Sequence, residues 1–135
     1  MRNRLYLKEN QGGIKMEFKM ISKEEQIKCQ KVSEAFEELY ELYGDMMVVD
    51  AGKFGFVHLR WFDGQCFSSN DTYTDSVELF EDLWEYWKEY HLLEPVKKTP
   101  LSDLSYEELY ELLSPDEKIT MEKKRQEFWH RAFES

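Results

Sequence analysis

The sequence predicts a single α+β domain, in which a three-stranded antiparallel β-meander combines with about four helices in the order α-β-β-β-α-α-α. Three observations lead to this fold class. The chain has 135 residues, 41% hydrophobic and 16% aromatic, which suffices for one core but not for two. Apolar residues recur at helical spacing before Gly44 and after Asp75, and they alternate in between. Turn residues divide the alternating region into short segments.

The first helix is expected over roughly residues 23–43. Ser22 and Glu25 have the spacing of a capping box, and Gly44 is a typical helix stop. The apolar residues of this helix are Ile27, Val32, Phe36, Leu39, Tyr40 and Tyr43.

Three strands should follow at about 46–49, 54–62 and 65–73. A two-residue turn at Asp63-Gly64 would pair Phe62 with Gln65, Trp61 with Cys66, Arg60 with Phe67 and His58 with Ser69. An even-length turn around residues 51–53 would then place Met46 and Val48 on the face of Trp61.

This register divides the meander into two faces of different composition. The uncharged face is predicted to be the core, and it holds Val57, Leu59, Trp61, Cys66, Met46 and Val48. The other face is a candidate recognition surface, because an arginine and aromatic rings can stack on a planar partner; it holds Phe56, His58, Arg60, Phe62, Phe67, Met47 and Val49. The alternative is that a helix covers this second face and that Arg60 and His58 reach out between the rings.

The remaining helices are marked by their first residues. Asp75 should cap a second helix over about 76–92, whose broad apolar arc implies burial against two partners. A linker from Glu94 to Pro100 precedes a short third helix that begins at Ser105. A fourth should start at Ser114 and run to about Phe133.

Two of these helices carry candidate binding surfaces. The second has an acidic face, Glu78, Glu81, Asp82 and Glu85, whose charges are ~5–6 Å apart and so resemble a row of phosphates; the alternative is a solvated face. The fourth ends in an apolar group that could join two copies into a homodimer, namely Phe128, Trp129 and Phe133. Its alternative is that the helix folds back onto the domain.

No catalytic or metal-binding motif is recognisable, so neither a cofactor nor a metal is expected. Cys66 and His58 should point to opposite faces of the hairpin, which disfavours a nucleophilic pair. Two cysteines in separate elements indicate free thiols. The N-terminus carries no apolar segment of a secretory signal, so the cytoplasm is the expected compartment. A net charge of −10 disfavours direct nucleic-acid or membrane binding.

Residues 1–15 are expected to be a flexible or mis-started N-terminal extension. Gln11-Gly12-Gly13 can be encoded by a purine-rich ribosome-binding sequence, which would place the start codon at Met16. Residues 1–15 contain four basic residues (Arg2, Arg4, Lys8 and Lys15) and one acidic residue (Glu9). Without them, the net charge would be −13 rather than −10. Residues 16–135 would then form the domain.

The sequence therefore predicts a small acidic bacterial protein of the cytoplasm that acts by binding another protein rather than by chemistry. Two alternatives stay open. One is an acidic nucleic-acid mimic that inhibits a DNA- or RNA-binding protein, and the other is an enzyme with a carboxylate site that the sequence does not locate.

Overall fold

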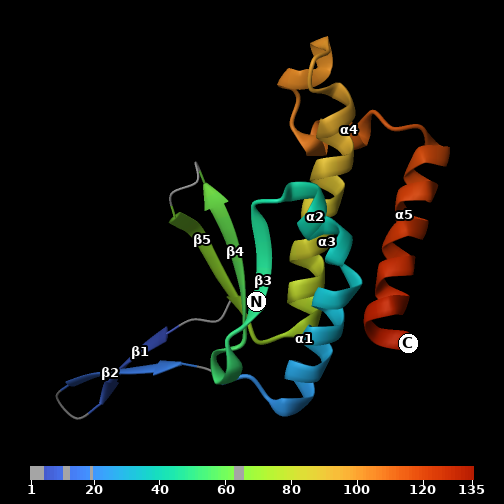
Figure 1. Ribbon diagram of the computed structural model, residues 1–135. Helices are drawn as coiled ribbons and strands as arrows, with labels where there is room; N and C mark the ends of the chain where they lie inside the picture. The colour runs from blue at the N-terminus through green and yellow to red at the C-terminus, as the bar shows by residue number, and fades with distance from the viewer. Residues whose placement is uncertain (1–4, 11–12, 19, 63–65) are drawn as a thin grey trace.

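The computed structural model describes residues 5–10, 13–18, 20–62 and 66–135, with side chains for 20–61 and 71–135 (Figure 1). A three-stranded antiparallel sheet has helices packed against one of its faces. The α+β class is confirmed, and after an N-terminal hairpin the order of elements broadly follows the expected α-β-β-β-α-α-α. The elements are α1 (Lys23–Ala35), α2 (Glu37–Tyr43), β3 (Met46–Asp50), β4 (Phe56–Phe62), β5 (Cys66–Tyr73), α3 (Ser76–Leu93), α4 (Tyr106–Glu111) and α5 (Pro115–Trp129).

The helix expected over residues 23–43 is divided at Phe36. The Ser22 side chain caps α1 by accepting a hydrogen bond from the Glu25 N–H at 3.1 Å, and Gly44 ends α2 with a left-handed φ of 68°. Phe36 leaves helical geometry between them, and its ring is fully buried. The predicted start and stop are therefore right, and the break places the Phe36 ring in the core.

The C-terminal helices begin at the residues that the sequence indicated. Asp75 caps α3 through the N–H groups of Val77 and Glu78, while Ser105 and Ser114 open α4 and α5 with capping boxes. The expected linker contains two short 3-10 turns, η2 (Glu94–Val96) and η3 (Pro100–Asp103). A final turn, η4 (His130–Glu134), follows α5.

The segment expected to be an extension includes most of a hairpin. β1 (Leu5–Asn10) pairs with β2 (Gly13–Phe18) in a two-stranded sheet of its own. A start at Met16 would remove β1 and half of β2, and this start stays a prediction.

The predicted register of β3 on β4 is wrong because the loop between them has an odd length. Asp50 pairs with Phe56, so five residues lie between the paired positions, and Val48 pairs with His58. Met46 and Val48 therefore share a face with His58 and Arg60 instead of Trp61. Gly55 makes the tight loop possible, because a Cβ there would collide with the Tyr73 carbonyl oxygen.

The predicted register of β4 on β5 is also wrong. His58 pairs with Asp71 rather than Ser69, and Phe62 pairs with Cys66 rather than Gln65. The register shifts between Arg60 and Trp61, as a β-bulge does. The expected turn at Asp63-Gly64 lies outside the described residues.

The inner face of the sheet, which carries Met46, Val48, Phe56, His58 and Arg60, is the one that packs against the helices. Phe56 is 0% and His58 1% exposed. The outer face carries Met47, Val49, Val57, Leu59 and Trp61, and Trp61 is 39% exposed. The assignment of the uncharged face to the core is thus wrong, and the alternative of a covering helix holds for Phe56 and His58. The side chains of Phe62, Cys66 and Phe67 lie outside the described part.

The C-terminal segment folds back onto the domain. The buried Phe128 ring stacks on Phe36 with 4.4 Å between centroids and meets Trp87 edge-on at 4.7 Å. Trp129 and Phe133 are half-buried and pack against Phe80. The alternative that this segment folds back onto the domain therefore holds, with Phe128 fully buried, and association of two copies through Phe128, Trp129 and Phe133 stays a prediction.

None of the described helices is both long enough and apolar enough to cross a membrane.

Candidate functional site

The acidic face of α3 is engaged within the domain. Asp82 accepts a hydrogen bond from His58 Nδ1 at 2.8 Å, and Glu81 forms an ion pair with Arg125 of α5. Glu85 binds Lys88 at 3.0 Å and accepts a hydrogen bond from the Tyr106 hydroxyl at 2.5 Å. Glu78, the remaining member, is half-buried. Three of the four acidic residues thus link α3 to β4, α4 and α5.

A polar cluster lies between the inner face and α3. Besides the His58–Asp82 pair, Arg60 binds Asp45 at 3.3 Å. The Arg60 guanidinium carbon also lies 5.0 Å from the Tyr43 ring centroid and 5.4 Å from that of Tyr86. The predicted stacking of Arg60 on aromatic rings thus occurs inside the molecule.

Burial raises the pKa of several side chains near these helices, Glu89 and Cys29 among them. It raises the pKa of Glu89 above the usual carboxyl range, while the positive charge of Arg60 partly opposes the shift. It also raises the pKa of the Cys29 thiol to about 12, with further contributions from Glu25 and other carboxylates. Cys29 is therefore held as a neutral thiol at physiological pH and is a poor nucleophile.

The His58–Asp82 pair has the hydrogen-bonded arrangement of a catalytic dyad, but its imidazole is closed to solvent. The His58 side chain is 1% exposed, and its Nε2 has no hydrogen-bond partner among the described residues. A general base must reach the proton that it removes. This pair therefore acts as a structural contact between β4 and α3.

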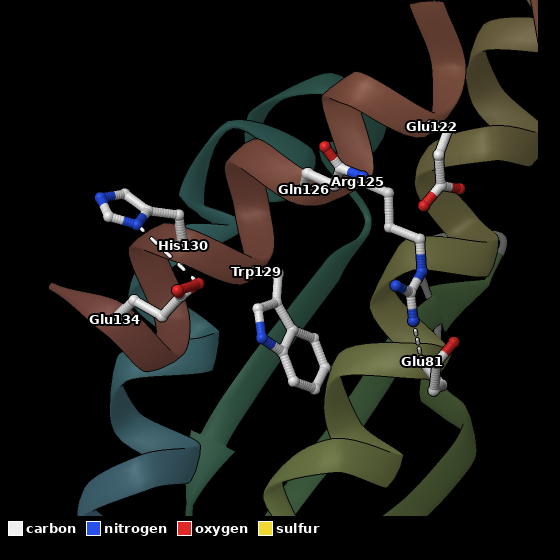
Figure 2. A pocket seen from close by; sticks show the side chains of 7 residues that line it. All are labelled: Glu81, Glu122, Arg125, Gln126, Trp129, His130 and Glu134. Atoms are coloured by element: carbon white, nitrogen blue, oxygen red, sulfur yellow. Dashed lines mark hydrogen bonds and ion pairs between the residues drawn. The ribbon is translucent and has the colours of Figure 1, made fainter. Parts of the chain in front are cut away.

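A cleft between α3 and the C-terminal part of α5 is open to solvent (Figure 2). It has a volume of about 550 Å³. Figure 2 shows the Trp129 indole projecting into the space between the two helices, with the Arg125 side chain extended toward Glu81 beside it. The cleft is lined by Glu81, Glu122, Arg125, Gln126, Trp129, His130 and Glu134.

The cleft combines an aromatic wall with an excess of carboxylates. Three glutamates face one arginine, and Glu134 also lies 4.0 Å from His130. The guanidinium carbon of Arg125 is 5.7 Å from the Trp129 ring centroid and 5.2 Å from that of Phe80. A cation is thus already held there by a carboxylate and two rings, which is how proteins bind arginine side chains.

Sequence reasoning found Trp129 and Glu81 but not the cleft that joins them. Arg125 and Trp129 are one helical turn apart, which is the only local signal. Glu81 belongs to a helix more than 40 residues earlier, so their meeting depends on how α5 packs against α3.

A second cleft, of about 780 Å³, lies between the C-terminal part of α3 and α5. Trp87, Leu92 and Met121 contribute apolar surface, and the rim has charges of both signs, including Lys123 and Asp116. This mixed rim selects no particular ligand charge.

The described residues contain no group of three or more histidine, cysteine or acidic side chains that could hold a metal ion. No family model, curated protein or solved structure matches the chain. The fold and the clefts define it as an α+β domain with an acidic, aromatic-walled cleft.

Proposed function

We propose that this chain is a protein-binding module that receives a basic segment of a partner protein in the cleft of Figure 2. The observation that carries the proposal is the way the cleft holds Arg125, against the Glu81 carboxylate and the rings of Phe80 and Trp129. A partner's arginine or lysine could use the same chemistry with Glu122, Glu134 and the solvent-facing part of Trp129.

The charge of the whole chain supports a basic partner. With a net charge of −10, the chain attracts cationic segments and so raises their rate of association. The distance over which this attraction acts becomes shorter as the salt concentration rises. We place partner binding in the cytoplasm, where a free thiol such as that of Cys29 stays reduced.

A binding role is favoured over an enzymatic one, because the His58–Asp82 pair is sealed and Cys29 is held neutral. The nucleic-acid mimic receives less support, because Glu81, Asp82 and Glu85 already have partners within the chain.

The experiment is a titration of the full chain with a fluorescein-labelled hexa-arginine peptide, followed by fluorescence anisotropy. Replacing both Glu122 and Glu134 by glutamine should weaken binding roughly tenfold, because each exposed pair contributes up to about 1 kcal/mol. The matched control replaces Glu37 and Glu41, two exposed carboxylates of α2, and should leave affinity within about twofold.

An equal loss in both double variants would show that the peptide responds only to net charge, and the proposed site would then be wrong. Absence of peptide binding at low salt would remove the proposal altogether.

A further inference from the structure

Arg125 occupies a place in the acidic cleft that suits any guanidinium group. It forms an ion pair with Glu81, and its guanidinium carbon lies 5.2 Å from the ring centroid of Phe80 and 5.7 Å from that of Trp129. We call this place the guanidinium position. A planar guanidinium pairs with a carboxylate and stacks on aromatic rings at the same time, so the position offers the environment of a bound arginine.

The contact between Arg125 and Glu81 is exposed to solvent. The Arg125 side chain is 27% exposed and that of Glu81 46%. Figure 2 shows the two side chains meeting in the space between α3 and α5, beside the Trp129 indole. Ion pairs with this degree of exposure are weak, so Arg125 can leave Glu81 at little cost.

Glu122 offers Arg125 a second partner. It precedes Arg125 by three residues on α5 and is exposed. Side chains at this spacing lie next to each other on a helix and can form an ion pair. Arg125 can therefore turn from Glu81 to Glu122 without any movement of the backbone.

We propose that Arg125 is an internal competitor, which fills the guanidinium position in the free chain and is replaced there by an arginine of the partner. This inference rests on the proposed function and narrows the partner's segment from basic to arginine-containing. The exchange retains the ion pairs, because the incoming guanidinium takes Glu81 while Arg125 turns to Glu122. A lysine would replace Arg125 less well, since its ammonium group is strongly hydrated and is not planar.

The proposal and a purely structural role of Arg125 predict opposite effects. A competitor lowers the apparent affinity in proportion to the fraction of molecules in which the position is empty. Removing Arg125 should then tighten the binding of an arginine peptide. If Arg125 only held Trp129 in place, its removal would weaken binding instead.

The first test compares Arg125→Ala with Lys123→Ala by fluorescence anisotropy, using labelled hexa-arginine and hexa-lysine peptides. Lys123 is an exposed residue of α5 outside this cleft, so the control removes the same charge from the same helix. Arg125→Ala should bind hexa-arginine about fivefold more tightly than the wild type, as for a position filled in roughly four of five molecules. Its affinity for hexa-lysine, and both affinities of Lys123→Ala, should stay within about twofold.

The second test uses ethylguanidinium, a small cation that needs only the guanidinium position. In ¹H–¹⁵N spectra of Arg125→Ala, millimolar ethylguanidinium should shift the Trp129 indole N–H signal until it saturates, and Trp129→Phe assigns that signal. The wild type should shift much less at the same concentration, because Arg125 competes. Ethylammonium at equal ionic strength is the matched control and should give the smaller shift in Arg125→Ala.

Two results would overturn the inference. They are an Arg125→Ala chain that binds hexa-arginine no more tightly than Lys123→Ala does, and a Trp129 signal in Arg125→Ala that ethylguanidinium does not shift. If Glu122 and Glu134 prove necessary for peptide binding in either case, the proposed function stands and this inference alone fails. If no variant binds the peptide, the proposed function fails, and the ethylguanidinium shift still decides whether the position accepts an external guanidinium. Thermal melts confirm that each variant is folded.

Discussion

The burial of the two faces of the central sheet is the reverse of what their amino-acid composition suggests. The inner face contains a histidine and an arginine and is covered by helices, while the outer face is uncharged in its described part and more exposed. The difference arises because α3 brings Asp82 to His58 and because Arg60 meets Asp45 and two tyrosine rings. Charged residues in a strand are compatible with burial when a neighbouring element supplies their partners.

The largest loss of stability should follow from a change in the helices that cover the inner face. Phe128→Ala removes a buried ring stacked on Phe36 and should lower the free energy of unfolding by about 3–5 kcal/mol. Urea denaturation followed by circular dichroism measures this loss. A loss below about 1 kcal/mol would mean that the C-terminal segment does not belong to the core.

The second largest loss of stability should follow from breaking the His58–Asp82 pair at the inner face. Asp82→Ala leaves the imidazole of His58 buried without its partner and should cost about 2–4 kcal/mol. Glu81→Ala is the matched control on the same helix, because Glu81 and Arg125 are both partly exposed, and it should cost less than about 1 kcal/mol. Equal losses in the two variants would contradict the structural role assigned to the His58–Asp82 pair.

The smallest effect concerns the pH dependence of stability. Burial raises the pKa of Glu89 in the folded chain, so its ionised form is less favourable there than in the unfolded chain. This cost is absent at a pH below the unfolded pKa and is fully present above the folded pKa. Glu89→Gln should therefore stabilise the fold slightly at pH 7, by about a few tenths of a kcal/mol because solvent screens this half-exposed group.

At about pH 4, near the unfolded pKa of a glutamate, the wild type and Glu89→Gln should have closely similar stability. Thermal melts at the two pH values provide the comparison. A variant that is less stable than the wild type at pH 7 would show that the attraction to Arg60 exceeds the cost of burial.

The element order could be predicted from the sequence because helix starts and stops are local signals. Ser22, Gly44, Asp75, Ser105 and Ser114 all act as expected. The faces of the sheet could not be predicted, because they depend on a loop of odd length before Phe56 and on a register shift after Arg60. A change of one residue in register exchanges the two sides of a strand.

The cleft of Figure 2 was only partly predictable. The acidic residues of α3 and the apolar end of α5 are visible in the sequence, and both were candidate binding residues. Their actual partners come from distant elements, since Asp82 meets β4 and Glu81 meets α5. Side-chain pairs of this kind are set by tertiary packing and leave no periodic signal.

The most direct test of the account compares two aromatic residues on opposite faces of β4. Phe56→Ala and Trp61→Ala are denatured in urea under the same conditions. We predict a loss of about 3–5 kcal/mol for Phe56→Ala, which removes a fully buried ring. For Trp61→Ala, whose side chain is 39% exposed, we predict a loss of about 1 kcal/mol. A larger loss for Trp61→Ala than for Phe56→Ala would contradict the assignment of the inner face to the core.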